Sequence, residues 1–159
     1  MIILGIDPGI EKMGCAVLEK SKNGEKLLHS SCFITDKKTP HEKRILKLGQ
    51  ELEKIIKKYK PDIMAVEKLF FSQNQKTALI VSEARGMVLY LAAINNISVT
   101  ELTPLEIKMA LTGYGRAEKR QVQSMAMTIL KIEKAPKHDD EMDAIATAIA
   151  CSSGLRHFK

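Results

Sequence analysis

The sequence predicts an α/β fold in which helices pack on a mixed five-stranded sheet. Short apolar runs of strand length alternate with longer segments that repeat apolar residues every three or four positions. In chain order they read as three strands, a helix, a strand, a helix, a strand and then further helices. With 45% hydrophobic and 28% charged residues, the composition is typical of a soluble globular protein, and 159 residues predict a single domain over 1–159.

The first three strands are predicted at residues 1–7, 13–20 and 26–35. The first of them, "MIILGID", is apolar almost throughout, which predicts a central place in the sheet. The polar stretch "KSKNGEK" over 20–26 predicts a hairpin turn between the second and the third strand.

An amphipathic helix is predicted over 39–60, followed by a short apolar strand over 61–68 that ends on Glu67. The apolar residues of this helix recur at spacings of three and four: Ile45, Leu48, Leu52, Ile55 and Tyr59. After a loop-like segment over 69–75, a second helix over 76–96 is apolar on more than one face. We expect that helix to be buried on two sides, either within the domain or across a subunit interface.

The last third of the chain predicts one strand and three helices. The strand covers 97–102, and the helix over 103–113 begins with a threonine cap and a proline. A basic turn over 114–119 precedes a helix over 120–131. The final helix, over 139–153, begins with a cluster of acids.

Charge and cysteine content exclude some classes of protein. A formal charge of +6 and a pI near 9.2 are compatible with a polyanionic partner. Three widely separated cysteines fit neither a zinc site nor a disulfide framework. No apolar stretch is long enough to span a bilayer and no secretion signal is recognisable, so we expect a cytoplasmic protein that does not bind membranes.

Four carboxylates at the ends of predicted elements are the candidates for chemistry: Asp7, Glu67, Asp140 and Asp143. Each has an ordinary explanation, because "DPG" is a turn signal, a strand end can reach water and acids cap helices. Two carboxylates about 4 Å apart would repel by roughly 4 kcal/mol at an effective dielectric near 20, so convergence would require raised pKa values or bound cations. Oxygen ligands favour Mg²⁺ or Mn²⁺, and two such ions suit phosphodiester displacement.

Four segments together resemble the RuvC family of Holliday junction resolvases: "GIDPGIEKMG", "AVEKLFF", "GYGRAEKRQVQ" and "DDEMDAIATAIA". The resemblance runs along essentially the whole chain. It implies an RNase H-like fold, a homodimer and Mg²⁺-dependent cutting of four-way DNA junctions in recombination and repair. It also implies partners of the branch-migration helicase type, RuvA and RuvB. The helix around residues 77–94 is the candidate dimer interface, because it is apolar on all sides.

The resemblance also implies a catalytic and metal-binding set of Asp7, Glu67, Asp140 and Asp143. "HDDEMD" contains more acids than the pattern requires, so Asp139 remains an alternative to Asp140. Two ions per site are implied by the resemblance, and the neighbouring His138 is interpreted as a loop residue.

The same resemblance assigns DNA contacts. It places an aromatic residue at Phe70, for stacking on an unpaired base, with Phe71 as the alternative. Lys108 and Lys119 match basic positions of the family, and Lys119 is expected to stabilise charge at the scissile phosphate. Arg116 and Arg120 are expected to extend this basic patch toward backbone phosphates; these two and Phe70, Lys108 and Lys119 form the predicted DNA-binding set.

Three other classes of protein share part of these features. ATP-binding proteins of the actin and sugar-kinase superfamily also have a first strand that runs into "GID", but they need a second phosphate loop and a second domain. Another RNase H-like nuclease, acting on RNA or RNA–DNA hybrids, would use the same carboxylates. A non-catalytic DNA-binding module is disfavoured because all four acids are present.

Overall fold

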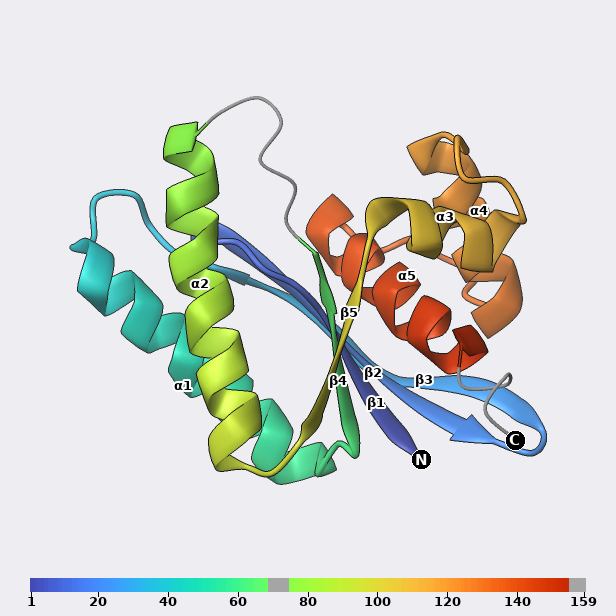
Figure 1. The fold of residues 1–159 in the computed structure, drawn as a ribbon, viewed down its shortest axis with the longest axis horizontal. Helices are drawn as coiled ribbons and strands as arrows, with labels where there is room; N and C mark the ends of the chain where they lie inside the picture. Colours follow the sequence, from blue (N-terminus) through green and yellow to red (C-terminus); the bar gives the residue numbers. More distant parts are fainter. Residues whose placement is uncertain (69–74, 155–159) are drawn as a thin grey trace.

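The computed structural model describes residues 1–68 and 75–154 of the chain (Figure 1). Its elements are β1 (Ile2–Asp7), β2 (Lys12–Ser21), β3 (Gly24–Ile34), α1 (His41–Tyr59), β4 (Ile63–Glu67), α2 (Gln75–Ile94), β5 (Ser98–Leu102), α3 (Pro104–Thr112), α4 (Lys119–Leu130) and α5 (Asp139–Gly154). The predicted order of strands and helices is therefore confirmed.

The five strands form one mixed sheet in the order β3-β2-β1-β4-β5. β1 pairs antiparallel with β2 and parallel with β4, so the apolar first strand is central, as predicted. β2 and β3 form a long antiparallel hairpin, whereas β4 and β5 run parallel. The hairpin extends farther than the sequence predicts, because Ser21 pairs with Gly24 and the turn shrinks to two residues. A positive φ of 118° at Gly24 suits glycine at this tight turn.

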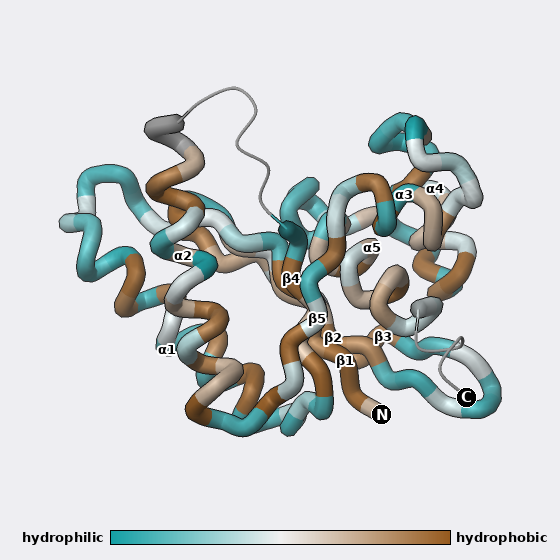
Figure 2. The backbone as a smooth tube through the Cα atoms, viewed as in Figure 1, coloured by the Kyte–Doolittle hydropathy of each residue, from teal (hydrophilic) through white to brown (hydrophobic). Residues whose placement is uncertain are grey.

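Helices cover both faces of the sheet, with α1 and α2 on one side and α3, α4 and α5 on the other (Figure 1). Alternate residues of the central strands feed two separate cores. Leu4 and Ile6 of β1 pack with α1 and α2, while Ile3 packs with the α3–α5 side. Figure 2 shows the resulting apolar stretches along the strands and the hydrophilic turns at the periphery.

Helix α5 lies unusually close to the sheet because glycines face it. A Cβ atom on Gly5 of β1 would overlap the carbonyl oxygen of Ala144, and one on Gly14 of β2 would overlap that of Asp140. Ala144 and Ala148 on the helix side keep the contact small. Gly5 pairs with Ala16 and Gly14 pairs with Asp7, so the two glycines lie on neighbouring strands, two positions apart in register, and together form a flat platform under the first turns of α5.

Local sequence explains how the short helices begin. Thr103 caps α3 through a capping box with Glu106, with Pro104 in the first turn, as the sequence predicts. α4 begins at Lys119, one residue earlier than predicted, because Glu118 and Gln121 form a reciprocal capping box. Lys119 therefore belongs to the first turn of a helix rather than to the preceding loop.

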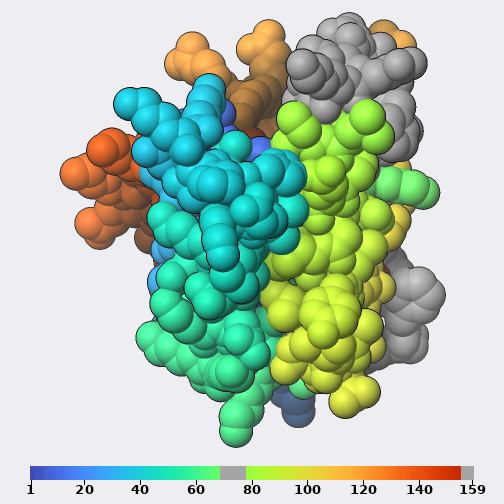
Figure 3. All heavy atoms as spheres, turned by 90° about the vertical axis from the view of Figure 1, so that its left-hand side faces the viewer, coloured from blue at the N-terminus to red at the C-terminus, as the bar shows by residue number. Residues whose placement is uncertain are grey.

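Helix α2 buries one face and exposes the other within this chain. Ala84, Val88, Leu91 and Ala92 face the sheet and are buried. On the opposite face, Leu79, Tyr90 and Ile94 are exposed by 65%, 63% and 52%. The sequence predicts burial on two sides, but contacts inside the chain bury one side of α2 and leave the other exposed. α1 and α2 lie side by side on this surface of the molecule (Figure 3).

No helix in the two described ranges is long and apolar enough to cross a bilayer.

Candidate functional site

Asp7 and Glu67 stand side by side at one edge of the sheet. Each is the last residue of its strand, and β1 pairs with β4 in parallel up to Ile6 and Val66. Because side chains alternate along a strand, Asp7 shares the face of Gly5, and Glu67 shares the face of Ala65. That is the face covered by α5. The two carboxylates therefore point toward the first turn of this helix.

The first turn of α5 brings two further acids to the same edge. Asp140 lies over Gly14, which pairs with Asp7 across β1 and β2. Asp143 follows after three residues and therefore lies on the same side of the helix. The charges of both carboxylates raise the pKa of Asp7, whereas the charge of Asp139 has no such effect on it. The structure thus brings together the four predicted acids.

The cluster carries raised pKa values because it gathers negative charge in a partly buried place. Burial, together with the charges of Asp143, Glu67 and Asp140, raises the pKa of Asp7 to about 7. Burial and the charge of Asp143 also raise the pKa of Glu67. The pKa of Asp143 is raised mainly by burial, against the opposing effect of its hydrogen bond with Lys119. A bound cation would relieve this repulsion.

Lys119 is the positive charge that faces the cluster. Its amino group donates a hydrogen bond to Asp143 over 2.8 Å and lies 3.4 Å from a carboxylate oxygen of Asp139. Burial lowers the pKa of Lys119, but the hydrogen bond and the charge of Asp143 outweigh burial and leave the pKa raised. The ammonium group is thus kept charged beside the acids. Sequence reasoning missed Asp139 as a partner of Lys119, because a contact between residues twenty positions apart on two helices leaves no local pattern.

A hollow of about 190 Å³ opens beside this ion pair. It is lined by residues from β4, α3, α4 and α5: Glu67, Pro104, Ile107, Lys108, Lys119, Val122, Asp143 and Ala146. Lys108 therefore lies at the same site as Lys119, although it belongs to a different helix. A phosphate entering this hollow would meet two ammonium groups beside the carboxylates.

The chemistry of the four acids fits a hard divalent cation, since all of their donors are carboxylate oxygens. Within the described ranges, no group of three or more His, Cys, Asp or Glu side chains is already arranged as a ligand set. Asp7, Glu67, Asp140 and Asp143 are the residues that would hold the ion.

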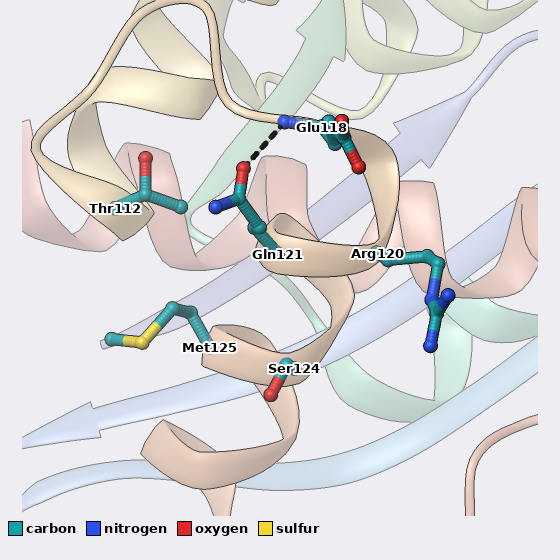
Figure 4. Close-up of a pocket in the computed structure, with 6 residues that line it drawn as sticks. All are labelled: Thr112, Glu118, Arg120, Gln121, Ser124 and Met125. Atoms are coloured by element: carbon teal, nitrogen blue, oxygen red, sulfur yellow. Dashed lines mark hydrogen bonds between the residues drawn. The ribbon is translucent and has the colours of Figure 1, made fainter.

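The remaining predicted DNA contacts either do not line the hollow beside Lys119 or fall outside the described residues. Arg116 is exposed in the α3–α4 connection. Arg120 lines a separate hollow of about 580 Å³ together with Thr112, Glu118, Gln121, Ser124 and Met125 (Figure 4). Phe70 and its alternative, Phe71, fall outside the described residues.

Comparison with known proteins agrees with this geometry. A family model described as "Crossover junction endodeoxyribonuclease RuvC" matches residues 3–151. A protein of that name from Desulforamulus reducens is 50% identical over 149 residues, which cover 94% of this chain and 91% of the relative. The solved structure of Thermus thermophilus RuvC superposes with a TM-score of 0.91 at 30% identity, covering 98% of this chain and 96% of that one. A second structure, of T. thermophilus RuvC in complex with Holliday junction substrate, gives a TM-score of 0.90 at 28% identity with the same coverage.

Proposed function

Because the chain belongs to the RuvC family of crossover junction endodeoxyribonucleases, we propose that it resolves four-way DNA junctions by paired, symmetric nicks. Each nick is the hydrolysis of one phosphodiester bond, in which a water oxygen attacks phosphorus and the 3′-oxygen departs. The observation that carries the proposal is the meeting of Asp7, Glu67, Asp140 and Asp143 at one edge of the sheet. Lys119 stands beside them, so the site combines acids with a fixed positive charge.

The four carboxylates would hold the catalytic cation, which we propose is Mg²⁺, with Mn²⁺ as a substitute and two ions per site. Such ions, when bound, supply Lewis-acid stabilisation of the charge that develops on the phosphate. Asp7 and Glu67 are fixed by strand pairing, and Asp140 and Asp143 by the close packing of α5 on Gly5 and Gly14. The protein thus presents its ligands from two strands and one helix rather than from loops.

Lys119 and Lys108 would act on the DNA directly. The ammonium group of Lys119 is already oriented by Asp143, and the hollow beside it opens toward both lysines. A fixed positive charge near the scissile phosphate stabilises a transition state in which negative charge accumulates. We propose that Lys119 has this catalytic role, that Lys108, Arg116 and Arg120 contact backbone phosphates, and that Phe70 stacks on a base.

A homodimer would give two such sites for the two strands of a junction. A twofold dimer matches a substrate of near-twofold symmetry, and each subunit would cut one strand. The exposed face of α2, with Leu79, Tyr90 and Ile94, is the proposed interface. Exposed apolar side chains on one helix face are typical of a protein contact. Partners of the RuvA and RuvB type are proposed from the family alone.

A cleavage assay with purified protein tests this function. Synthetic four-way DNA junctions, plain DNA duplex and RNA–DNA hybrid are each incubated with and without Mg²⁺, in parallel with Asp7→Asn. Paired nicks in the junction alone, absent without Mg²⁺ and absent in the variant that still binds, are the expected result. Cleavage of the hybrid in place of the junction would overturn the substrate, and binding without any cleavage would indicate a non-catalytic module.

A further inference from the structure

A second hollow, of about 640 Å³, adjoins the carboxylate cluster. It lies near the beginning of α1 and α2, on the side of the cluster that faces away from Lys119. Its lining comes from the β1–β2 turn, the start of β2, the β3–α1 connection and helices α1, α2 and α5, and includes Glu11, Lys12, Lys37, Arg44 and Asp140. We call it the Arg44 groove. Asp140 belongs to its wall, whereas Asp143 belongs to the wall of the hollow with Lys119. The acids therefore lie between two hollows that both contain basic residues.

The guanidinium group of Arg44 is held in place by a chain of hydrogen bonds. Its Nε atom donates to the hydroxyl oxygen of Thr35 over 2.8 Å. The same hydroxyl donates to the carbonyl oxygen of Ile10 over 2.6 Å, and the Thr35 backbone N–H donates to the carbonyl oxygen of Glu11 over 2.9 Å. Thr35 is only 4% exposed. Arg44 is thereby fixed relative to the turn that directly follows Asp7.

This anchoring uses one of the five N–H donors of Arg44 and leaves its terminal NH₂ groups available. Among the described residues, no carboxylate forms an ion pair with Arg44 or with Lys12. The acid of the same turn, Glu11, is instead paired with Lys37 over 3.0 Å. Two cations of the groove, Arg44 and Lys12, are therefore not held in an ion pair with a described carboxylate. A guanidinium fork that is oriented before the ligand arrives suits bidentate binding of a phosphate and lowers the entropy cost of binding.

We propose that the Arg44 groove binds a backbone phosphate of the junction DNA, on the far side of the scissile phosphate from Lys119, with Arg44 as the principal contact and Lys12 beside it. This inference rests on the proposed function. A strand whose scissile phosphate lies at Asp7 and Asp140 would then be held on both sides of the cut. Such contacts set the register of the strand without reading its sequence.

Salt-dependent binding to a synthetic four-way junction, measured without Mg²⁺ so that no cleavage occurs, tests the proposal. For Arg44→Gln we expect about tenfold weaker binding and a salt slope smaller by about one unit, the same for junctions of different sequence. Arg44→Lys retains the charge but not the fork, so the slope should be restored while part of the affinity loss remains. Lys57→Gln is the matched control, because it removes one charge from the distant end of α1, where Lys57 pairs with Glu53.

Separate outcomes distinguish this inference from the function on which it rests. Thermal unfolding of Arg44→Gln near the wild-type temperature would show that the variant is folded. An unchanged affinity and slope in that folded variant, with wild-type protein that cleaves the junction in Mg²⁺, would overturn the Arg44 groove and leave the function intact. Equal losses in Arg44→Gln and Lys57→Gln would also overturn it, since net charge alone would then explain binding. Wild-type protein that does not bind the junction would overturn both.

Discussion

The amino group of Lys119 lies 2.8 Å from a carboxylate oxygen of Asp143, so the N-terminal ends of α4 and α5 meet through an ion pair. Asp139, one turn earlier in α5, lies 3.4 Å from the same amino group. The pair places a permanent cation at the edge of a cluster of acids. Its lysine is about half exposed and remains accessible to a ligand.

Replacing this lysine should slow the chemical step more than DNA binding. For Lys119→Met we expect a cleavage rate about 10²- to 10³-fold lower, because a charge directed at the transition state is lost. Single-turnover cleavage of a labelled four-way junction, with the protein in excess, measures the rate. Lys54→Met is the control, because Lys54 forms an exposed pair with Glu51 on α1. A Lys119→Met rate within threefold of wild type would exclude a catalytic role for this residue.

Asp7→Asn should stabilise the metal-free protein at pH 8. The pKa of Asp7 is about 7 in the folded state, against an ordinary value of 3.8. Between pH 3.8 and pH 7, the folded state therefore keeps a proton on Asp7 that the unfolded state has released. The free energy of unfolding therefore falls as the pH rises through this window. Asparagine removes the effect, and we expect a gain on the order of 2 kcal/mol at pH 8 that disappears near pH 4.

Urea denaturation at both pH values, with a chelator present, measures this gain. Glu106→Gln provides the opposite case, because hydrogen bonds from Thr103 lower the pKa of Glu106. Its carboxylate stabilises the folded state above its ordinary pKa of 4.5 and loses this effect as the pH falls, so this variant should be destabilised at pH 8. An Asp7→Asn protein less stable than wild type at pH 8 would contradict the pKa shift.

Gly5→Ala should push α5 away from the sheet. The new methyl group would overlap the carbonyl oxygen of Ala144, which is backbone and has no rotamer with which to move aside. We expect a loss of about 2–4 kcal/mol in the free energy of unfolding, together with loss of cleavage. Gly49→Ala is the matched control in α1, where the added methyl group would lie 3.5 Å from the Met87 sulfur, an ordinary contact. It should raise stability by up to about 1 kcal/mol, and equal effects of the two variants would exclude the packing argument.

Asp140→Asn and Asp139→Asn should separate the two neighbouring acids. Asp140 acts on the ionisation of Asp7, whereas Asp139 faces Lys119 and is 74% exposed. We expect Asp140→Asn to abolish cleavage and Asp139→Asn to lower it by less than tenfold. Cleavage rates measured over a Mg²⁺ titration compare them. The opposite ranking would make Asp139 the ligand.

Tyr90→Glu should convert the proposed dimer into monomers. The tyrosine is 63% exposed on the outer face of α2, and a charge placed there would be costly to bury against a partner. Sedimentation velocity at micromolar concentration measures the molecular mass of wild type and variant. Leu105→Glu serves as control, since Leu105 is equally exposed, at 60%, but lies on α3. A monomeric wild-type protein would contradict the interface itself.

The sequence predicts the sheet well because its signals are local. An apolar run such as "IILGID" contains enough information to place β1 at the centre, and Thr103 with Pro104 marks the start of α3. Ends that depend on reciprocal side-chain contacts are less predictable. The predicted start of α4 is wrong by one residue. The Glu118–Gln121 capping box begins the helix at Lys119, whereas Gly115 gives the segment before it the composition of a loop.

The candidate site also has parts that the sequence predicts and parts that it does not. Spacing and resemblance identify Asp7, Glu67, Asp140 and Asp143, and the structure brings them to one edge of the sheet. The Thr35–Arg44 contact could not be predicted, because it joins a strand end to a helix through a buried hydroxyl. Nor does any pattern in the sequence show that Gly5 and Gly14 both lie beneath α5, since their positions depend on the register of two strands.

The platform of Gly5 and Gly14 has a consequence for how DNA is selected. Because α5 touches the strands almost directly, the acids on the helix and those on the sheet have little freedom to move relative to one another. Adjustment between enzyme and substrate must then come from the nucleic acid, which has to bend or open to bring a phosphate to the acids. DNA that deforms at low energetic cost would be cut in preference to stiff duplex, so selectivity for branched DNA would arise from its mechanics rather than from closure of the protein.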